Sequence, residues 1–269
     1  MYGQQHHFNQ FCRRIETFIL GQGLYMIQPT YLTLDHTPRN KTNSERIRFD
    51  MHLHSCYSSD SSTSIDTITE SYQRTGILPL VCDHNTITGS ERVYTILRKN
   101  NPDITTVLAE EIMTSNGEII GLFLQEEISP FLSTEETLDV IHDQGGLALV
   151  PHPFCSYRSC ALKKDVMVTN IDRIDIIEGF NGRILDDWEN ALARGFAERY
   201  RKPVSAGSDA HTSFELGRTF VCCEPFSDPK GLMKALPDAS VHYTHTHPAI
   251  HSVTRLVKAG RRLGLVRSP

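Results

Sequence analysis

The sequence has no long apolar run. Its most apolar stretches, residues 119–124 and 147–150, have the length of strands, whereas a membrane-spanning helix needs at least about 18 consecutive apolar residues. The first 15 residues are mostly polar, unlike the uninterrupted apolar stretch of a secretory signal. We therefore expect a cytoplasmic protein that makes no membrane association.

Positive charge is not in excess either. Lysine and arginine number 27 and aspartate and glutamate 32, a net charge of -5, which argues against a protein that coats nucleic acid through a basic face. Nucleic acid is then expected only as a substrate. The seven cysteines include no Cys-x-x-Cys pair, a pattern that favours reduced thiols over a disulfide scaffold. No internal repeat is evident, and 269 residues allow one large domain or two small ones.

What the sequence does contain is a series of short apolar runs that alternate with segments of helical spacing. Helices are predicted at 65–74, at 137–144 behind a capping box of Ser133 and Glu136, and at 186–200. Alternating strands and helices predict a mainly parallel sheet covered by helices. The predicted strands are 47–53, 78–82, 105–109, 119–124, 147–150, 174–177, 204–206 and 219–222.

Polar residues follow the carboxyl ends of most of these strands. An active site supplied by many strand ends is typical of a barrel, because an open sheet offers a single crevice. We therefore expect an α/β protein with a TIM-like barrel. The expected organisation is an N-terminal extension of unknown role (1–45), the barrel (46–225), and a C-terminal helix and strand segment that packs on it (226–269).

Histidines and carboxylates recur among these polar residues. His52 and His54 lie two apart in a strand, so both imidazoles face the same side, with Asp50 on that side as well. Asp209 and His211 repeat this spacing after Gly207. Oxygen and imidazole donors without convergent thiolates suit Mn, Fe or Zn. The candidates exceed the needs of one ion, which predicts two or three divalent ions and hydrolytic chemistry. The further candidates are Asp60, His84, Glu111 and His152.

At these residues the sequence resembles the PHP family, the polymerase and histidinol phosphatase domain of metal-dependent phosphoesterases. The resemblance runs from about residue 46 to 211 and implies a distorted (β/α)7 barrel with up to three ions at its strand ends. The motifs that support it are Asp50-Met51-His52-Leu53-His54-Ser55, Ser59-Asp60, Cys82-Asp83-His84-Asn85, Glu110-Glu111-Ile112, Pro151-His152-Pro153, Glu178-Gly179-Phe180-Asn181 and Gly207-Ser208-Asp209-Ala210-His211.

The same resemblance assigns ligands to three ions. The first would be held by His52, His54, Glu111 and Asp209; the second by Glu111, as a bridge, and His152; the third by Asp60, His84 and His211. Many relatives have a histidine where this chain has Glu118, three residues before a Gly-Leu pair. Since a glutamate can bind a hard cation such as Mn, Glu118 is expected to complete the second site; otherwise it is a solvated residue.

Positive groups that hold phosphate oxygens are also needed, and arginine does this with two parallel hydrogen bonds. Arg158 is the first candidate, because the family often has an arginine in the loop after His152; Arg183 and Arg218 are weaker ones. His84 or His211, where free of metal, or a metal-bound water, would protonate the leaving oxygen.

The resemblance implies hydrolysis of phosphate esters by a metal-bridging hydroxide. The negative net charge, with no aromatic RNA-binding motif, favours a small phosphorylated substrate such as a nucleotide or other phosphomonoester. Two alternatives stay open at this point: a 5′-3′ exonuclease or phosphodiesterase on short oligonucleotides, and a catalytically inactive metal-binding scaffold. The oligomeric state is not indicated.

Overall fold

The computed structural model describes residues 46–264, so the predicted N-terminal extension at 1–45 lies outside the described residues. The strands are β1 (Ile47–Leu53), β2 (Ile77–Val81), β3 (Ala109–Thr114), β4 (Gly117–Leu122), β5 (Leu147–Val150), β6 (Ile176–Asn181), β7 (Val204–Gly207), β8 (Phe220–Cys223) and β9 (Ser240–His242). The helices are α2 (Ile65–Thr75), α3 (Thr88–Asn100), α4 (Thr134–Asp143), α5 (Lys164–Thr169), α6 (Asp187–Tyr200), α7 (Pro229–Ala235) and α8 (Ile250–Arg262), with a 3-10 turn at Leu236–Asp238.

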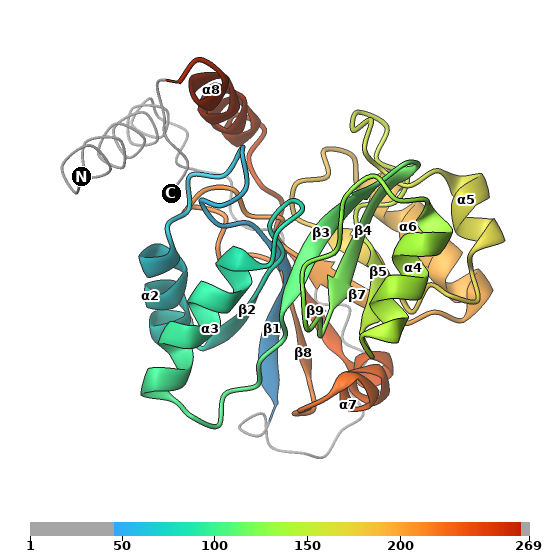
Figure 1. Ribbon diagram of the computed structural model, residues 1–269, viewed down its shortest axis with the longest axis horizontal. Helices are drawn as coiled ribbons and strands as arrows, with labels where there is room; N and C mark the ends of the chain where they lie inside the picture. Colours follow the sequence, from blue (N-terminus) through green and yellow to red (C-terminus); the bar gives the residue numbers. More distant parts are fainter. Residues whose placement is uncertain (1–45, 265–269) are drawn as a thin grey trace.

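These strands form two sheets rather than one continuous ring. One sheet has the order β2-β1-β8-β9 and the other β3-β4-β5-β6-β7 (Figure 1). Two isolated parallel bridges, Leu53 with Ala210 and His84 with Glu111, link the sheets where β1 and β2 end. The structure therefore confirms a mixed α/β fold, whereas the expected closed TIM-like barrel is not confirmed.

The prediction of a mainly parallel sheet is wrong. Only the pairs β1 with β2, β5 with β6 and β6 with β7 are parallel in the described part of the chain. β3 and β4 are antiparallel because two residues, Ser115 and Asn116, connect them, and a parallel pair needs a crossover of a dozen or more residues. β8 and β9 also run antiparallel to their neighbours.

Local signals fixed the helix ends well. Ser64 caps α2 by accepting a hydrogen bond from the backbone of Thr67, and Gly76 ends the helix in the left-handed conformation that glycine adopts without strain. The predicted capping box of Ser133 and Glu136 is confirmed at the start of α4. All three predicted helices are present with bounds shifted by at most three residues.

The third strand lies further along the chain than predicted. The apolar run at 105–109 is mostly loop, and β3 begins at Ala109 and includes Glu110 and Glu111. Charged residues are rarely buried, so the sequence analysis placed these two glutamates after the strand. Both are nevertheless buried, on opposite faces of β3, since neighbouring residues of a strand point to opposite sides.

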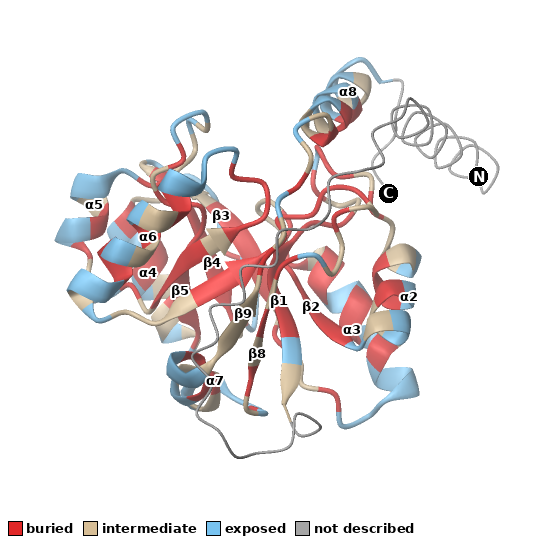
Figure 2. Ribbon diagram, turned by 180° about the vertical axis from the view of Figure 1, so that it is seen from behind, coloured by how far each residue is buried: buried red, intermediate tan, exposed pale blue. Residues whose placement is uncertain are grey.

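Two apolar clusters hold the elements together. One is built on β1 and β2 beneath α2 and α3, with Phe49, Leu80 and Val93 at its centre. The other fills the space between the second sheet and helices α4 and α6, and includes Ile119, Leu138 and Phe196. Figure 2 shows the result, with buried strands in the interior and exposed outer helix faces.

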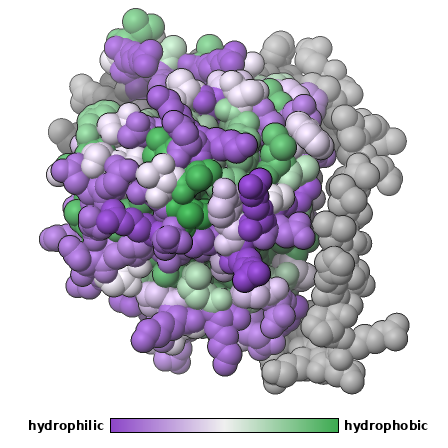
Figure 3. Space-filling model, turned by 90° about the vertical axis from the view of Figure 1, so that its right-hand side faces the viewer, coloured by the Kyte–Doolittle hydropathy of each residue, from purple (hydrophilic) through white to green (hydrophobic). Residues whose placement is uncertain are grey.

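The face of the molecule that carries α5 is mainly hydrophilic, with a few small apolar areas (Figure 3). Within residues 46–264, none of the helices is both long enough and apolar enough to cross a bilayer.

The C-terminal segment adds strand β9 to the first sheet and then forms helix α8. β9 pairs with β8, and the chain runs on into α8, whose Ile250, Val253 and Val257 are buried. Figures 1 and 2 both place α8 at the end of the molecule opposite α7, beside the loop that follows β1. α8 therefore lies on the side where β1 has its carboxyl end.

His251 in α8 is expected to make the stability of the fold depend on pH. Burial, and then the positive charges of Arg183 and Arg158, lower the pKa of His251 to about 4. A histidine whose pKa is lower in the folded than in the unfolded chain stabilises the fold fully above about pH 6.5, and that contribution is lost as the pH falls toward 4. We expect His251→Gln to flatten the fall in Tm between pH 7 and pH 5. Equal Tm slopes for the variant and the natural chain would contradict this.

Candidate metal centre

The centre begins on β1. His52 and His54 are completely buried and point to the same side of the strand, with their Nε2 atoms 3.1 Å apart. The predicted two-residue spacing thus brings both imidazoles together. Two ring nitrogens this close fit either an N–H···N hydrogen bond between the rings or two ligands of one cation.

Glu111 on β3 lies at the middle of four imidazoles. Its Oε1 is 3.5 Å from His52 Nε2 and 3.0 Å from His152 Nε2. Its Oε2 is 3.4 Å from His54 Nε2 and 3.0 Å from His84 Nδ1. Each carboxylate oxygen therefore faces a different histidine pair, His52 with His152 and His54 with His84. This pairing differs from the implied first site, in which His52 and His54 share one ion.

Asp209 and Asp60 supply further carboxylates to the same imidazoles, and Asp60 also faces His211. Asp209 Oδ1 lies 3.7 Å from His52 Nε2 and 3.5 Å from His54 Nε2. Asp60 Oδ1 lies 3.6 Å from His84 Nε2 and 3.4 Å from His211 Nε2. The structure therefore brings together all nine residues that the sequence analysis named as ligands, Glu118 included.

Glu118 stands where many relatives have a histidine. It projects from β4, and its two carboxylate oxygens lie 3.5 Å from His84 Nδ1 and 3.6 Å from His152 Nε2. Burial, and then repulsion from Glu111, raise the pKa of Glu118. A cation in its vicinity would relieve both effects, so the position favours the ligand role over that of a solvated residue.

The residues of the centre fit divalent cations. The buried Oδ1 atoms of Asp209 and Asp60 have no hydrogen-bond partner among the described residues, and buried polar atoms are rarely left unpaired without a functional reason. Oxygen and imidazole donors are those that Mn, Fe or Zn would use. Four groups of three side chains could each offer ligand atoms within 4.8 Å of one another: His52, His54 and Cys82; His54, His84 and His211; His52, Glu111 and His152; and His84, Glu111 and Glu118.

Opposite charges in the centre stabilise each other. Burial raises the pKa of Glu111, but the nearby His52, His84 and His152 together lower it, so it lies well below its ordinary value. For His84 the order is reversed: burial lowers its pKa, and Glu111 and Asp60 raise it by more.

A set of orienting contacts was missed by the sequence analysis. Glu178 Oε1 lies 3.0 Å from His52 Nδ1, and its Oε2 accepts a hydrogen bond from the backbone N–H of His152. His54 Nδ1 lies 3.0 Å from the hydroxyl of Ser58, which donates to Asp83. These contacts hold the Nδ1 sides of His52 and His54 and leave their Nε2 atoms to the centre. The sequence feature that could have indicated these contacts is Glu178, the one acidic residue of β6.

The three candidate arginines occupy different surroundings. Arg158 lies in the centre, with its guanidinium 2.5 Å from Asp209 Oδ2 and 17% of its side chain exposed. Arg183 is buried, pairs with Glu215 at 3.3 Å and donates to Thr254. Arg218 is exposed, and no ion pair of its side chain is present within the described residues. Only Arg158 thus lies among the metal-ligand candidates.

Strained backbone positions two of the ligands. His152 has a φ of 32° and Asp209 a φ of 54°, values that side-chain-bearing residues rarely adopt outside functional sites. Gly207 precedes this turn because a Cβ at that position would lie 2.3 Å from the Cβ of His52. The close approach of β7 to β1 therefore requires glycine.

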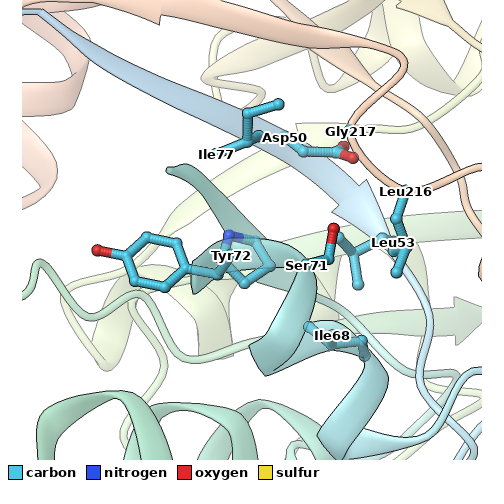
Figure 4. A pocket seen from close by; sticks show the side chains of 9 residues that line it. Asp50, Leu53, Ile68, Ser71, Tyr72, Ile77, Leu216 and Gly217 are labelled. Atoms are coloured by element: carbon cyan, nitrogen blue, oxygen red, sulfur yellow. The ribbon is translucent and has the colours of Figure 1, made fainter. Parts of the chain in front are cut away.

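Asp50, which the sequence places on the same strand as the two histidines, faces elsewhere. Its carboxylate accepts hydrogen bonds from the backbone and hydroxyl of Ser208. It lines a small pocket between β1, α2 and the Leu216–Gly217 turn (Figure 4). Burial raises its pKa to about 7, against the opposing effect of Ser208. Asp50 therefore ties β1 to the loop that contains Asp209.

Part of the chain matches a known family, and two curated proteins are similar to it. A family model described as PHP-associated matches residues 187–241. Two uncharacterized proteins of Methanocaldococcus jannaschii are similar: one is 33% identical over 178 residues, which are 65% of this chain and 70% of that protein. The other is 34% identical over 146 residues, 50% of this chain and 84% of that protein.

Among solved structures, the fold resembles a two-domain protein of Bacteroides vulgatus described as containing a predicted PHP-like metal-dependent phosphoesterase. The TM-score is 0.58 at 15% identity, over 74% of this chain and 65% of that one. Fold and site together define a PHP-like α/β protein with a centre of buried histidines and carboxylates. The chain belongs to the PHP domain family.

Proposed function

We propose that this protein is a metal-dependent phosphatase that acts on a nucleotide or another small phosphomonoester. The observation that supports this most is the position of Glu111, whose two oxygens face four imidazoles from three separate segments of the chain. The description of the Bacteroides vulgatus protein as containing a metal-dependent phosphoesterase supports the same reaction class.

In this proposal the ligands are His52, His54, Asp60, Glu111, Glu118, His152, Asp209 and His211, with His84 at the edge of the set. Divalent ions bound there would polarise the phosphoryl group and make a water molecule nucleophilic at neutral pH. Arg158 would hold non-bridging oxygens of the phosphate, because its guanidinium reaches the centre and is anchored on Asp209.

His84 is the better proton donor of the two histidines considered. Its side chain is 24% exposed, whereas that of His211 is 5% exposed. A leaving group points toward the solvent opening, so the more exposed imidazole is the one that meets it. His84 would fill this role only where it is free of metal, because a general acid must carry the proton that it donates.

The burial of the centre favours a monoester over a chain of nucleotides. His52, His54 and Asp209 are completely buried, whereas the alternative, an exonuclease or phosphodiesterase, needs an open groove beside its ions. The proposed substrate therefore enters with a terminal phosphate first.

Ion content and phosphate release test this function together. We expect the purified full chain to contain two or three divalent ions, and to release phosphate from nucleotides or sugar phosphates with Mn²⁺ but little product from bis-p-nitrophenyl phosphate. Chelation should abolish the activity and Mn²⁺ should restore it. Bound ions without phosphate release from any ester would instead support the scaffold alternative, and faster cleavage of diesters the phosphodiesterase.

A further inference from the structure

α8 presents a polar stripe to the metal centre. His251, Thr254, Lys258 and Arg261 are spaced by three, four and three residues, which places them along one side of a helix. The helix contains no acidic residue, and it includes Arg255 and Arg262 besides the two cations of the stripe. α8 thus brings positive charge to the side of the molecule where the centre lies (Figure 1).

The stripe is attached at both of its ends. At one end, Arg183, which follows β6, donates to the hydroxyl of Thr254 at 2.8 Å. At the other end, Arg261 donates to the backbone carbonyls of Cys56, Ser58 and Ser61, in the loop between β1 and α2. The ten residue steps from His251 to Arg261 correspond to about 15 Å of helix. α8 therefore extends from the segment after β6 to the segment after β1, and the latter contributes His54 and Asp60 to the centre.

Lys258 lies between these two attachments and beside a ligand. Its ammonium group is 3.5 Å from Asp60 Oδ2, and 46% of its side chain is exposed. The other oxygen of Asp60 faces His84 and His211. Lys258 consequently stands at the solvent-facing edge of the centre, on the side of Asp60 that the imidazoles leave open.

The attachment of α8 does not depend on Lys258, whose contact with Asp60 is that of a half-exposed ion pair. Arg261 already fixes the helix to the loop, and Asp60 is faced by two imidazoles. A lysine on a flexible stem is well suited to meet a phosphate that arrives from solvent, because its three donors can rotate toward it.

We propose that Lys258 binds a second phosphate group of the substrate while the first lies at the metal centre. The preferred substrates are then molecules with two phosphates or with a phosphodiester next to a terminal phosphate. This inference rests on the proposed phosphatase function and goes further by naming the substrate class.

Matched substrates test the proposal. Fructose 1,6-bisphosphate is compared with fructose 6-phosphate, and 5′-phosphorylated dithymidylate with thymidine 5′-phosphate, so that the two sources of a second phosphate are separated. We expect the natural chain to have a roughly tenfold lower KM for at least one doubly charged member, the value of one charge-assisted hydrogen bond. The pair that shows the preference identifies the source.

Three variants test whether Lys258 causes the preference for doubly phosphorylated substrates. Lys258→Ala should remove it by raising KM for the doubly phosphorylated substrate with a smaller effect on kcat, and Lys258→Arg should restore most of it. Lys230→Ala removes an exposed lysine from α7, at the opposite end of the molecule, and should keep the preference. Loss of the preference in Lys230→Ala as well, or its survival in Lys258→Ala, would overturn the proposal.

A binding measurement separates this inference from the function on which it rests. Calorimetric titration of the chain loaded with Ca²⁺ in place of the activating ion, with fructose 1,6-bisphosphate and with phosphorylated dithymidylate, should give a roughly tenfold weaker affinity in Lys258→Ala for the preferred ligand. If Lys258→Ala binds the ligand more weakly but the natural chain hydrolyses no ester, the phosphatase function is refuted and the phosphate site at Lys258 is retained. Equal affinities would refute the phosphate site, whatever the activity.

Discussion

Glu111→Gln is expected to lower phosphate release by a factor of roughly 10²–10³ or more and to reduce the ion content of the chain. The substitution keeps the shape of the side chain but removes the negative charge that faces four imidazoles. One of the two oxygens becomes an NH2 group, which cannot bind a cation. Ion content by elemental analysis and phosphate release with Mn²⁺ are the two measurements.

The neighbouring glutamate provides a matched control. Glu110 is also buried, but it lies on the other face of β3 and accepts a hydrogen bond from the backbone N–H of Ile128. Glu110→Gln retains that acceptor, so we expect ion content and activity to stay within about threefold of the natural chain. Similar losses in both variants would mean that the strand, and not the carboxylate of Glu111, is responsible.

Glu178→Gln is expected to weaken ion binding by roughly 10–100-fold, the usual cost of losing a group that orients a metal ligand. Glu178 does not face the middle of the centre; it holds His52 through Nδ1 and His152 through its backbone. With an amide in place of the carboxylate, the tautomer of His52 that leaves Nε2 free is no longer enforced. The measurement is an ion titration followed by calorimetry or by activity against Mn²⁺ concentration.

Two observations would separate this positioning role from a merely structural one. Saturating Mn²⁺ should restore most of the activity of Glu178→Gln, and the ¹⁵N shifts of His52 should report the change of tautomer. Glu189→Gln, at a buried glutamate that accepts from the backbone of Ser156, should bind ions normally. Activity that stays low at saturating Mn²⁺ would contradict the positioning role.

The candidate ligands could be predicted because their signal is local. His52 with His54, and Asp209 with His211, are two apart in sequence, and this spacing alone puts both side chains on one face of a strand. Their repetition after several apolar runs predicted convergence on one site, and the structure does bring these side chains together. Helix ends were predictable for the same reason, since the hydrogen bonds of a capping box join residues three apart.

The strand pairing could not be predicted in this way. Whether β3 and β4 join as a hairpin, and whether β8 runs against β1, depends on contacts between residues far apart in the chain. The apolar pattern of a strand is the same for either direction of its neighbour. The position of β3 was predicted wrongly because Glu110 and Glu111 are charged, and charged residues in sequence indicate a loop. That Glu111 is buried becomes understandable only from the imidazoles that face it in the folded chain.

The sequence by itself determined an α/β chain with a set of histidines and carboxylates at the ends of its strands, because those properties depend on spacings of a few residues. Only the tertiary structure decided that the hydrogen-bonded strands divide into two sheets, that Glu178 holds two ligands, and that α8 brings Lys258 to Asp60. These features join segments up to about 200 residues apart, and such pairings are selected by the burial and charge neutralisation of the whole fold.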